Sequence, residues 1–377
     1  MNFPKFQYRL QLFLLGLSRD LRTLFGLLKS KNNNPPDKIL ISGLVLLGDL
    51  VLISPLFQAL KQEFPHASLE LLVPEGWGVF SQTFKNIDRV FESKKNNPSW
   101  FRQFKSQHKN RWQLGVIPWS YASINLFYAL NITQIRSFPD PKNRKLYRIH
   151  QKISLPTQAD HFSLMTLALS SQAQTYYPAP YFNLEKISKI PTLFNLSSPY
   201  AIIHPGASNF TKYWGAENYA AMANYLISLG YHIILTGTAP EKILTEQIAL
   251  KIPRALNLAG QTKLHELLVL ISKAQLVLGP DTGVLHLTRA LNIPSITLMG
   301  PTQFKIYGPH SKFHNLEITK ALSVNSLPCQ DAQTIFKHKI SGVANCRRSV
   351  CLYPETYCMT GLTQDAVKNL INQVLKI

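Results

Sequence analysis

Short apolar segments alternate with longer stretches of helical periodicity through most of the chain, and this alternation constrains the fold more than any other feature. In the first half, strand-like runs occupy Lys38–Ser42, Leu69–Val73, Val90–Phe91 and Gln113–Ile117, and one helix is expected over Asp49–Phe64. An alternation of strands and helices is typical of a parallel sheet that helices cover on both faces. The sequence therefore predicts an α/β protein.

The second half repeats the alternation. Strands are expected over Ala201–His204, His232–Thr236, Leu276–Leu278 and Ser295–Met299. Helices are expected over Ala216–Leu229, Glu241–Lys251, Leu264–Ser272 and Val284–Leu291. A chain of 377 residues is too long for one ordinary core. The proline-rich stretch 174–199 separates the halves. We therefore expect an N-terminal domain over 38–185 and a C-terminal domain over 186–377, with the last helix in the second domain or packed back on the first.

Residues 1–37 form a segment of different character. Apolar residues recur there at helical spacing, with basic residues around the stripe: Leu10, Phe13, Leu14, Leu17, Leu21, Leu24 and Leu28, then Lys5, Arg9, Arg22 and Lys29. Such an amphipathic helix lies in a membrane interface or docks on the protein's own surface, and the pattern leaves both open. The segment resembles no signal peptide and holds no apolar run of membrane-spanning length. We expect a cytoplasmic protein, peripheral at the inner membrane.

The charge balance points to anionic partners. The chain has 40 Lys and Arg against 20 Asp and Glu, a formal charge of +20. Such a field attracts nucleic acid, anionic lipid or phosphorylated sugars, and composition does not choose among them. The basic run that includes Arg144, Lys145 and Arg148 is either a solvated loop or a cradle for an anionic acceptor. No nucleic-acid recognition module is visible, so we expect no nucleic-acid partner.

Three junctions between strands and loops in the second half carry candidate site residues. Ser208 and Lys212 follow the strand that ends at His204, and a hydroxyl and an ammonium beside free amides suit a diphosphate. A tight turn at a strand end has the same appearance. Glu241 follows the strand that ends at Thr236, where it either contacts a ribose or begins a helix.

The third junction is Asp281-Thr282-Gly283, with His286 about one turn later. The first-turn amides of a helix that begins here have no partner within the helix and would bind an anion. The alternative makes Asp281 an ordinary N-cap and His286 a core histidine.

These segments together resemble glycosyltransferase family 9, the ADP-heptose:lipopolysaccharide heptosyltransferases. The resemblance covers about residues 38–375. It is carried by His204-Pro205-Gly206, Lys212 with Trp214, Leu235-Thr236-Gly237, Asn257–Gly260, Asp281-Thr282-Gly283 with His286, Leu47-Gly48-Asp49 with Pro55-Leu56, Phe64-Pro65, Asp160-His161, and the tail cysteines Cys346, Cys351 and Cys358.

The resemblance implies the GT-B fold, with two Rossmann-like domains that face each other across a cleft. It also implies inverting, metal-independent transfer from a nucleotide-sugar substrate, expected to be ADP-heptose, to an anionic glycolipid of the lipopolysaccharide core, without a cofactor. Donor contacts are implied for Ser208, Lys212, Glu241, Asp281, Thr282, Gly283 and His286.

Asp49 matches the general base of the family, which takes the proton of the acceptor hydroxyl while the anomeric carbon is oxocarbenium-like. The alternative is a helix N-cap. The chain departs from the family pattern just before this residue. Gly43 and Val45 stand where a basic residue and a small hydroxylated one are usual, on the acceptor side.

No metal site is expected from the sequence. The chain has no Asp-x-Asp pair to chelate a divalent ion, so Lys212 and helix N-termini would neutralise the diphosphate. The four cysteines, Cys329, Cys346, Cys351 and Cys358, match no strong zinc spacing and are expected as reduced thiols.

Two other functions compete with glycosyl transfer. A nicotinamide-dependent dehydrogenase needs Gly-x-Gly-x-x-Gly after the first strand, and residues 42–48 do not supply it. A non-catalytic protein that binds anionic lipid or nucleic acid would rest on the charge alone. A transferase of another activated sugar stays open, because the motif around Asp281 is suited to phosphate and ribose more than to the sugar.

Overall fold

The computed structural model describes residues 34–377 except 95–96, 120–121, 133, 139–150, 155–156, 159, 174–176, 192–198, 253, 325–326, 336–337, 347, 349 and 354. The expected N-terminal amphipathic helix lies outside the described residues. So do Arg144, Lys145 and Arg148, the candidate acceptor cradle.

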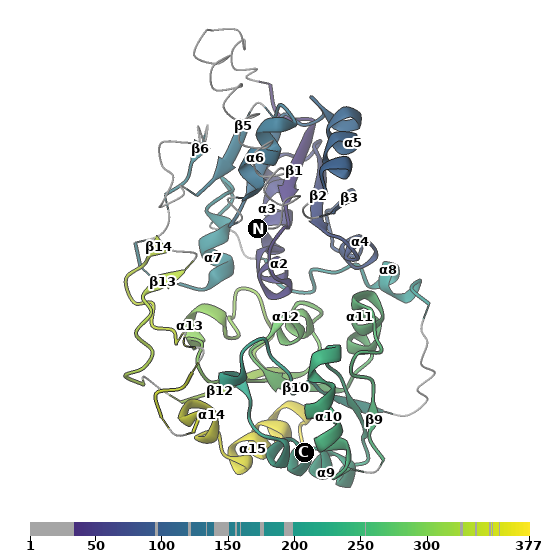
Figure 1. Cartoon of the computed structure of the whole chain (residues 1–377), viewed down its shortest axis with the longest axis vertical. Coiled ribbons are helices and arrows are strands. Elements are labelled where there is room, and N and C mark those ends of the chain that lie inside the picture. The colour runs from purple at the N-terminus through teal and green to yellow at the C-terminus, as the bar shows by residue number, and fades with distance from the viewer. Residues whose placement is uncertain are drawn as a thin grey trace. The chain divides into compact units, whose positions relative to one another are not determined.

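The chain forms two compact units, each built on a parallel sheet (Figure 1). The first unit comprises the described parts of the chain up to Leu46, of Ile53–Leu155 and of Ser163–Thr175. The second comprises Leu47–Leu52, the described parts of Pro156–Phe162, and Tyr176–Ile377. The short segment Leu47–Leu52, which includes Asp49, thus groups by its contacts with the second unit.

The sheet of the first unit has the strand order β3-β2-β1-β4-β5-β6, and every pair is parallel. Its strands are β1 (Lys38–Ser42), β2 (Ser68–Pro74), β3 (Arg89–Ser93), β4 (Leu114–Ile117), β5 (Gln134–Ser137) and β6 (Gln151–Lys152). The helices in this part of the chain are α2 (Leu47–Ile53), α3 (Pro55–Glu63), α4 (Gly78–Ser81), α5 (Pro98–His108), α6 (Ala122–Ala129) and α7 (Phe162–Leu167). All four strands predicted in this half are present.

The single helix predicted over Asp49–Phe64 is wrong, because the structure divides it into α2 and α3. The break falls at Ser54-Pro55. Proline has no amide hydrogen to donate to the preceding turn, whereas the first position of a helix needs none. Pro55 accordingly begins α3.

The sheet of the second unit has the order β12-β11-β10-β7-β8-β9 and is also parallel throughout. Its strands are β7 (Tyr200–Ile203), β8 (His232–Leu235), β9 (Leu256–Asn257), β10 (Leu276–Pro280), β11 (Ser295–Met299) and β12 (Thr319–Ser323). A small antiparallel pair, β13 (Thr334–Ile335) and β14 (His338–Lys339), follows.

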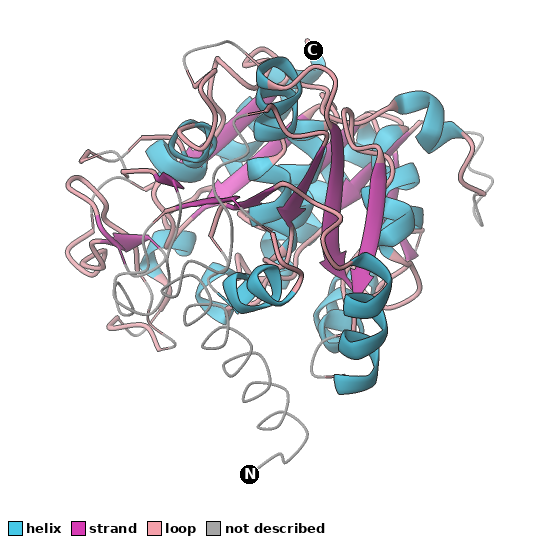
Figure 2. Ribbon diagram, turned by 90° about the horizontal axis from the view of Figure 1, so that it is seen from above, coloured by secondary structure: helices cyan, strands magenta, loops and turns pink. Residues whose placement is uncertain are grey.

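Figure 2 shows helices, in cyan, beside the strands, in magenta, and the second unit has its own set of helices. They are α8 (Leu184–Ser188), α9 (Ala216–Ser228), α10 (Lys242–Ala249), α11 (Leu264–Ser272), α12 (Gly283–Ala290), α13 (Phe304–Tyr307), α14 (Tyr357–Thr360) and α15 (Gln364–Leu375), with the 3-10 turns η1 (Phe210–Lys212) and η2 (Ala239–Glu241). The last helix, α15, packs against α9, β11 and β12 of its own unit.

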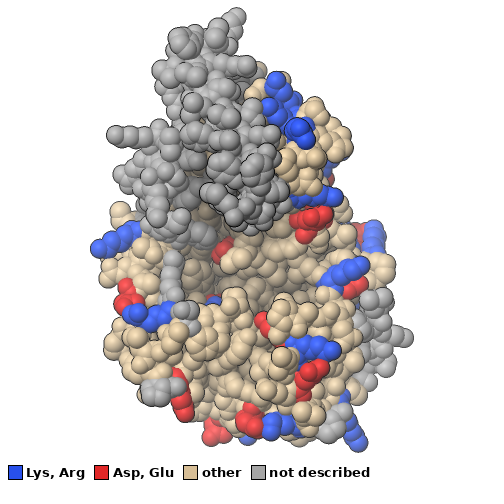
Figure 3. Space-filling model, viewed as in Figure 1, with Lys and Arg blue, Asp and Glu red and all other residues tan. Residues whose placement is uncertain are grey.

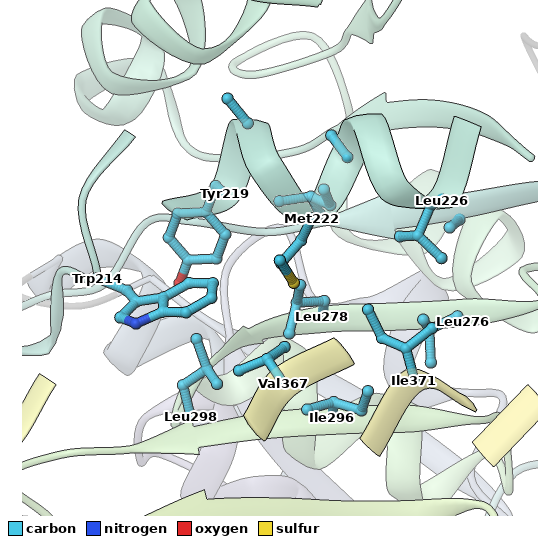
Figure 4. Packing of buried hydrophobic residues seen from close by; sticks show 14 of the residues in the cluster. Trp214, Tyr219, Met222, Leu226, Leu276, Leu278, Ile296, Leu298, Val367 and Ile371 are labelled. Atoms are coloured by element: carbon cyan, nitrogen blue, oxygen red, sulfur yellow. The ribbon is translucent and has the colours of Figure 1, made fainter. Parts of the chain in front are cut away.

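A continuous apolar layer joins the sheet of the second unit to α9 and α15. Alternate residues of the strands face these helices, and Tyr219, Met222 and Leu226 of α9 meet Val367 and Ile371 of α15 around them (Figure 4). The strand residues between them point to the opposite face, as the period of two requires. The opposite face carries α12, which contacts β10 and β11.

The two sheets share one topology. Numbered within its own unit, each sheet has the Rossmann order 3-2-1-4-5-6. In such a sheet the strand order reverses between the first and fourth strands, which here are β7 and β10 in the second unit. Ligands bind just beyond the carboxyl ends of strands at this switch point. The fold therefore predicts a ligand site at the loops after β7 and β10.

No described helix is long and apolar enough to cross a membrane. On the face shown in Figure 3, the described Lys and Arg side chains are scattered, with Asp and Glu among them. That face thus presents its described positive charge in a dispersed form.

Candidate active site

Lys212 reaches the switch point of the second unit from the loop after β7. The loop runs through Pro205 and Gly206 into η1, whose N-cap is Asn209; the Asn209 Oδ1 accepts a hydrogen bond from the amide of Thr211 at 3.2 Å. The turn ends at Lys212, and its ammonium donates to the backbone oxygen of Asp281 at 2.6 Å and to Asp281 Oδ2 at 3.2 Å. Two residues that are 69 positions apart in the sequence thus form one site.

Asp281 lies between β10 and α12 and is 4% exposed. The alternative that made it an N-cap is wrong, because Thr282 is the N-cap of α12 and makes no side-chain capping bond. Asp281 is instead surrounded by donors. Besides Lys212, the hydroxyl of Thr302 donates to its Oδ2 at 2.7 Å, and the Nε2 of His286 lies 3.1 Å from its Oδ1.

These neighbours keep Asp281 ionised. Burial acts to raise the pKa of this carboxyl, but the positive charge of Lys212 and the contact with His286 outweigh it and hold the pKa well below its usual range. The site therefore contains a fixed carboxylate, an ammonium directed at it, and the start of α12. The side-chain oxygen of Thr282 is buried there without a partner in the described residues.

His286 and Arg289 lie one turn apart on α12. Arg289, which is 1% exposed, donates to the Nδ1 of His286, to the backbone oxygen of Tyr307 at 2.8 Å and to the hydroxyl of Thr297 at 3.1 Å. Sequence reasoning missed both Arg289 and Thr302. The spacing from His286 to Arg289, three residues on a helix, was the one available signal for Arg289. No local pattern linked Thr302 to Asp281.

Glu241 ends η2 and belongs to a capping box, in which its carboxylate accepts from the amide of Thr238 at 2.7 Å. Its carboxylate also lies against the loop after β7. A Cβ added to Gly206 would be 2.2 Å from the Cδ of Glu241, and one added to Gly237 would be 3.3 Å from its Oε2. Glycine at 206 is therefore what allows Glu241 to approach Lys212's loop.

We expect Gly206→Ala to displace the Glu241 carboxylate with little loss of stability, because the clash is with the end of a flexible side chain. If Glu241 contacts the donor nucleotide, Gly206→Ala and Glu241→Gln should weaken nucleotide binding by about tenfold each, the effect of one lost hydrogen bond to a charged group. Calorimetric titration measures this affinity. Additive losses in the double variant would contradict a shared cause.

Asp49 lies in the first turn of α2, which begins at Leu47, so Asp49 is not an N-cap. Its segment touches α12 within the second unit. A Cβ on Gly48 would lie 3.0 Å from the Cδ2 of His286, and one on Gly283 would lie 3.0 Å from the amide nitrogen of Gly48. Two glycines thus allow the backbone next to Asp49 to rest on the first turn of α12.

Ser208 is exposed in the loop after β7. The four cysteines are free thiols, and burial raises the pKa of Cys358 to about 11. Among the described residues, no three His, Cys, Asp or Glu side chains are placed so that they could share a metal ion.

Buried neutral histidines should make the protein acid-labile. Burial lowers the pKa of His161, His204, His286 and His314. A histidine whose folded pKa is lowered stabilises the fold above its unfolded pKa, and this stability is lost as the pH falls. Lowering the pH from 7.5 to about 6.5 should cost about 1–2 kcal/mol of unfolding free energy in total.

Urea unfolding at the two pH values measures this loss. His161→Gln should reduce the pH dependence of the unfolding free energy, whereas His66→Gln, at an exposed position, should leave that dependence unchanged. An unfolding free energy that does not vary with pH would contradict the expectation.

Two Rossmann-like units on parallel sheets of one topology make up the GT-B fold, which the chain shares with the solved structure of E. coli ADP-heptose lps heptosyltransferase II at a TM-score of 0.66, 18% identity and coverage of 90% and 98%. The chain belongs to glycosyltransferase family 9, the heptosyltransferases, because the model of the family described as "Glycosyltransferase family 9 (heptosyltransferase)" matches residues 126–340. The chain is therefore an enzyme of the glycosyltransferase class.

Individual relatives agree with the family. The chain is 26% identical over 308 residues to lipooligosaccharide heptosyltransferase 2 of Haemophilus ducreyi, a match that covers 73% of this chain and 86% of the relative. Its fold is similar to that of E. coli heptosyltransferase WaaC with ADP, with a TM-score of 0.67, 19% identity and coverage of 89% and 99%. It is also similar to the iron-containing dodecameric glycosyltransferase TibC of enterotoxigenic E. coli, with a TM-score of 0.57, 14% identity and coverage of 91% and 80%.

Proposed function

We propose that this enzyme transfers heptose from ADP-heptose to the lipopolysaccharide core or a closely related glycolipid. The observation that carries the proposal is the contact of Lys212 with Asp281 at the start of α12. The matched relative is named as a lipooligosaccharide heptosyltransferase, and the similar solved structure of WaaC holds ADP.

The donor diphosphate is proposed to bind at the switch point of the second unit. Lys212 supplies the positive charge, and the amides of Thr282 and Gly283 supply donors at the start of α12. Ser208 and His286 complete the phosphate side, and Glu241 binds the ribose. Asp281 holds the ammonium of Lys212 in place until the donor arrives.

Asp49 is proposed as the general base. A carboxylate next to the donor takes the proton from the acceptor hydroxyl as the oxygen bonds to the anomeric carbon and the nucleoside diphosphate leaves, which inverts that carbon. The contact of Gly48 with His286 and Gly283 supports this role, because it brings the backbone before Asp49 to the proposed donor site.

Transfer is proposed to need no metal, since Lys212 and α12 already supply positive charge to the diphosphate. TibC, which has a similar fold, is named as iron-containing, so the metal independence of transfer is tested separately. Turnover that persists in excess chelator would support metal independence, and turnover restored only by added metal would overturn it.

The formal charge of +20 supports action at an anionic membrane surface, which co-sedimentation with anionic vesicles tests.

Thermal-shift measurements with ADP-, UDP- and GDP-sugars test the choice of donor. A ligand at about a hundred times its Kd adds about 2.7 kcal/mol to the unfolding free energy. We expect ADP and ADP-heptose to raise the Tm by several degrees and the other nucleotides to leave it unchanged. A larger shift with a UDP- or GDP-sugar would indicate another donor, and no shift with any nucleotide would overturn the proposal.

A further inference from the structure

Arg289 is the least expected side chain near the site. Arginine is almost never fully buried unless it is paired with an acid, yet the hydrogen bonds of Arg289 go to neutral groups. They go to the hydroxyl of Thr297, the backbone oxygen of Tyr307 and the ring nitrogen Nδ1 of His286. Among the described residues no carboxylate forms an ion pair with Arg289, so its positive charge lies behind His286 without an acid of its own.

The bond from Arg289 determines which nitrogen of His286 carries the proton. A guanidinium has only N–H donors, so the nitrogen that faces it must accept and therefore bears no hydrogen. Nδ1 is that nitrogen. The remaining hydrogen of the neutral ring is then on Nε2, which lies 3.1 Å from Oδ1 of Asp281. The contact at Nδ1 therefore fits only the neutral ring with its hydrogen on Nε2. On the other edge, Nε2 lies close to Oδ1, and this oxygen has no hydrogen-bond partner among the described residues.

The surroundings favour the neutral ring as well. Burial and the charge of Arg289 lower the pKa of His286, and Asp281 opposes them. The other groups that act on this ring are Lys212, from the loop after β7, and the histidines His161 and His314, whose pKa values are also lowered by burial.

We propose that Arg289 is a positioning residue that holds His286 in its neutral, Nε2-protonated form and thereby orients Asp281 toward Lys212. Thr297 and Tyr307 fix the guanidinium, the guanidinium fixes the ring, and the ring lies against one oxygen of Asp281, with Nε2 and Oδ1 3.1 Å apart. The other oxygen of Asp281 is left for Thr302 and Lys212. That this order serves the donor diphosphate rests on the proposed function, whereas the state of His286 does not.

Removal of Arg289 should release this arrangement in a defined direction. Without the guanidinium, Nδ1 of His286 can take up a proton, and Asp281 stabilises the resulting imidazolium. The pKa of His286 should rise, and the ring should titrate near neutral pH. ADP binding should then become pH-dependent, weaker at pH 8 and recovering toward pH 6, because the protonated ring replaces the lost positive charge.

The full chain labelled with 15N-histidine tests the proposal directly by NMR. The His286 signals are assigned by their loss in His286→Gln, and Arg289→Met is compared with Arg289→Lys. In the unmodified chain, Nδ1 should be unprotonated and Nε2 protonated from pH 8 to pH 6. In Arg289→Met, the His286 ring should titrate in this range. Arg289→Lys keeps a donor and a charge, so it should restore the neutral ring with its hydrogen on Nε2.

A hydrogen on Nδ1 in the unmodified chain would overturn the proposal, as would an unaltered His286 titration in Arg289→Met. If Arg289→Met does not fold, the protonation state in the unmodified chain, which needs no substitution, decides the matter. Calorimetric ADP titration at pH 6 and pH 8 is the second measurement. Failure of the unmodified chain to bind ADP would count against the proposed function, while the NMR result would still decide the role of Arg289.

Discussion

Replacement of Asp49 by Asn is expected to lower kcat by about 10²- to 10⁴-fold, the usual contribution of a general base, while ADP binding is unchanged. Asn has almost the same shape as Asp but accepts no proton at neutral pH. Asp49 lies in the first turn of α2, in the segment that contacts α12. The substitution therefore separates proton transfer from donor binding.

The measurement is steady-state transfer together with calorimetric ADP titration of the same preparation. Asp365→Asn is the matched control, because Asp365 is also an acid in the first turn of a helix, α15, and is exposed. It reproduces any loss of helix-dipole stabilisation without affecting the site. If Asp49→Asn retains near-normal kcat, or loses ADP binding as well, Asp49 is not the base.

Lys212→Met is the second substitution with a large expected effect, and it should act on both stability and binding. It leaves the buried carboxylate of Asp281 without its opposite charge. Removal of one partner of a buried ion pair costs about 3–5 kcal/mol, because the other charge stays buried and uncompensated. It also removes the positive charge proposed to meet the donor diphosphate, so ADP binding should fall below detection.

A double-mutant cycle with Asp281→Asn tests the pairing. Asp281→Asn with Lys212→Met should recover much of the unfolding free energy, measured in urea, because neither charge remains. The control is Lys251→Met, which breaks the exposed contact of Lys251 with Glu217 at 2.8 Å and should cost at most about 1 kcal/mol. A single-variant loss as small as that of Lys251→Met would show that the pair contributes little.

Local patterns in the sequence carried most of the strand predictions. The apolar runs at Lys38–Ser42 and Ser295–Met299 coincide with β1 and β11, because a buried parallel strand needs continuous apolar residues. The helix predicted over Leu264–Ser272 coincides with α11, because its apolar residues recur at helical spacing. The edge strands β9 and β12 have no such run, and sequence reasoning did not predict them.

The site residues were predicted by motif, but their partners were not. The sequence singled out Lys212, Asp281 and His286 as candidates, and the structure brings these three together. It did not indicate that Asp281 binds Thr302, or that Arg289 lies behind His286. It also suggested that Asp281 is an N-cap, a role that Thr282 takes instead.

By itself, the sequence determined that the chain forms two α/β units, because strand and helix periodicities arise from neighbouring residues and need no knowledge of the rest of the chain. Only the tertiary structure decided the strand order of each sheet and therefore which loops meet. β7 and β10 are neighbours because the sheet reverses its order there, and this brings Lys212 to Asp281. The protonation state of His286 was decided in the same way, since it depends on which donor faces each ring nitrogen in three dimensions.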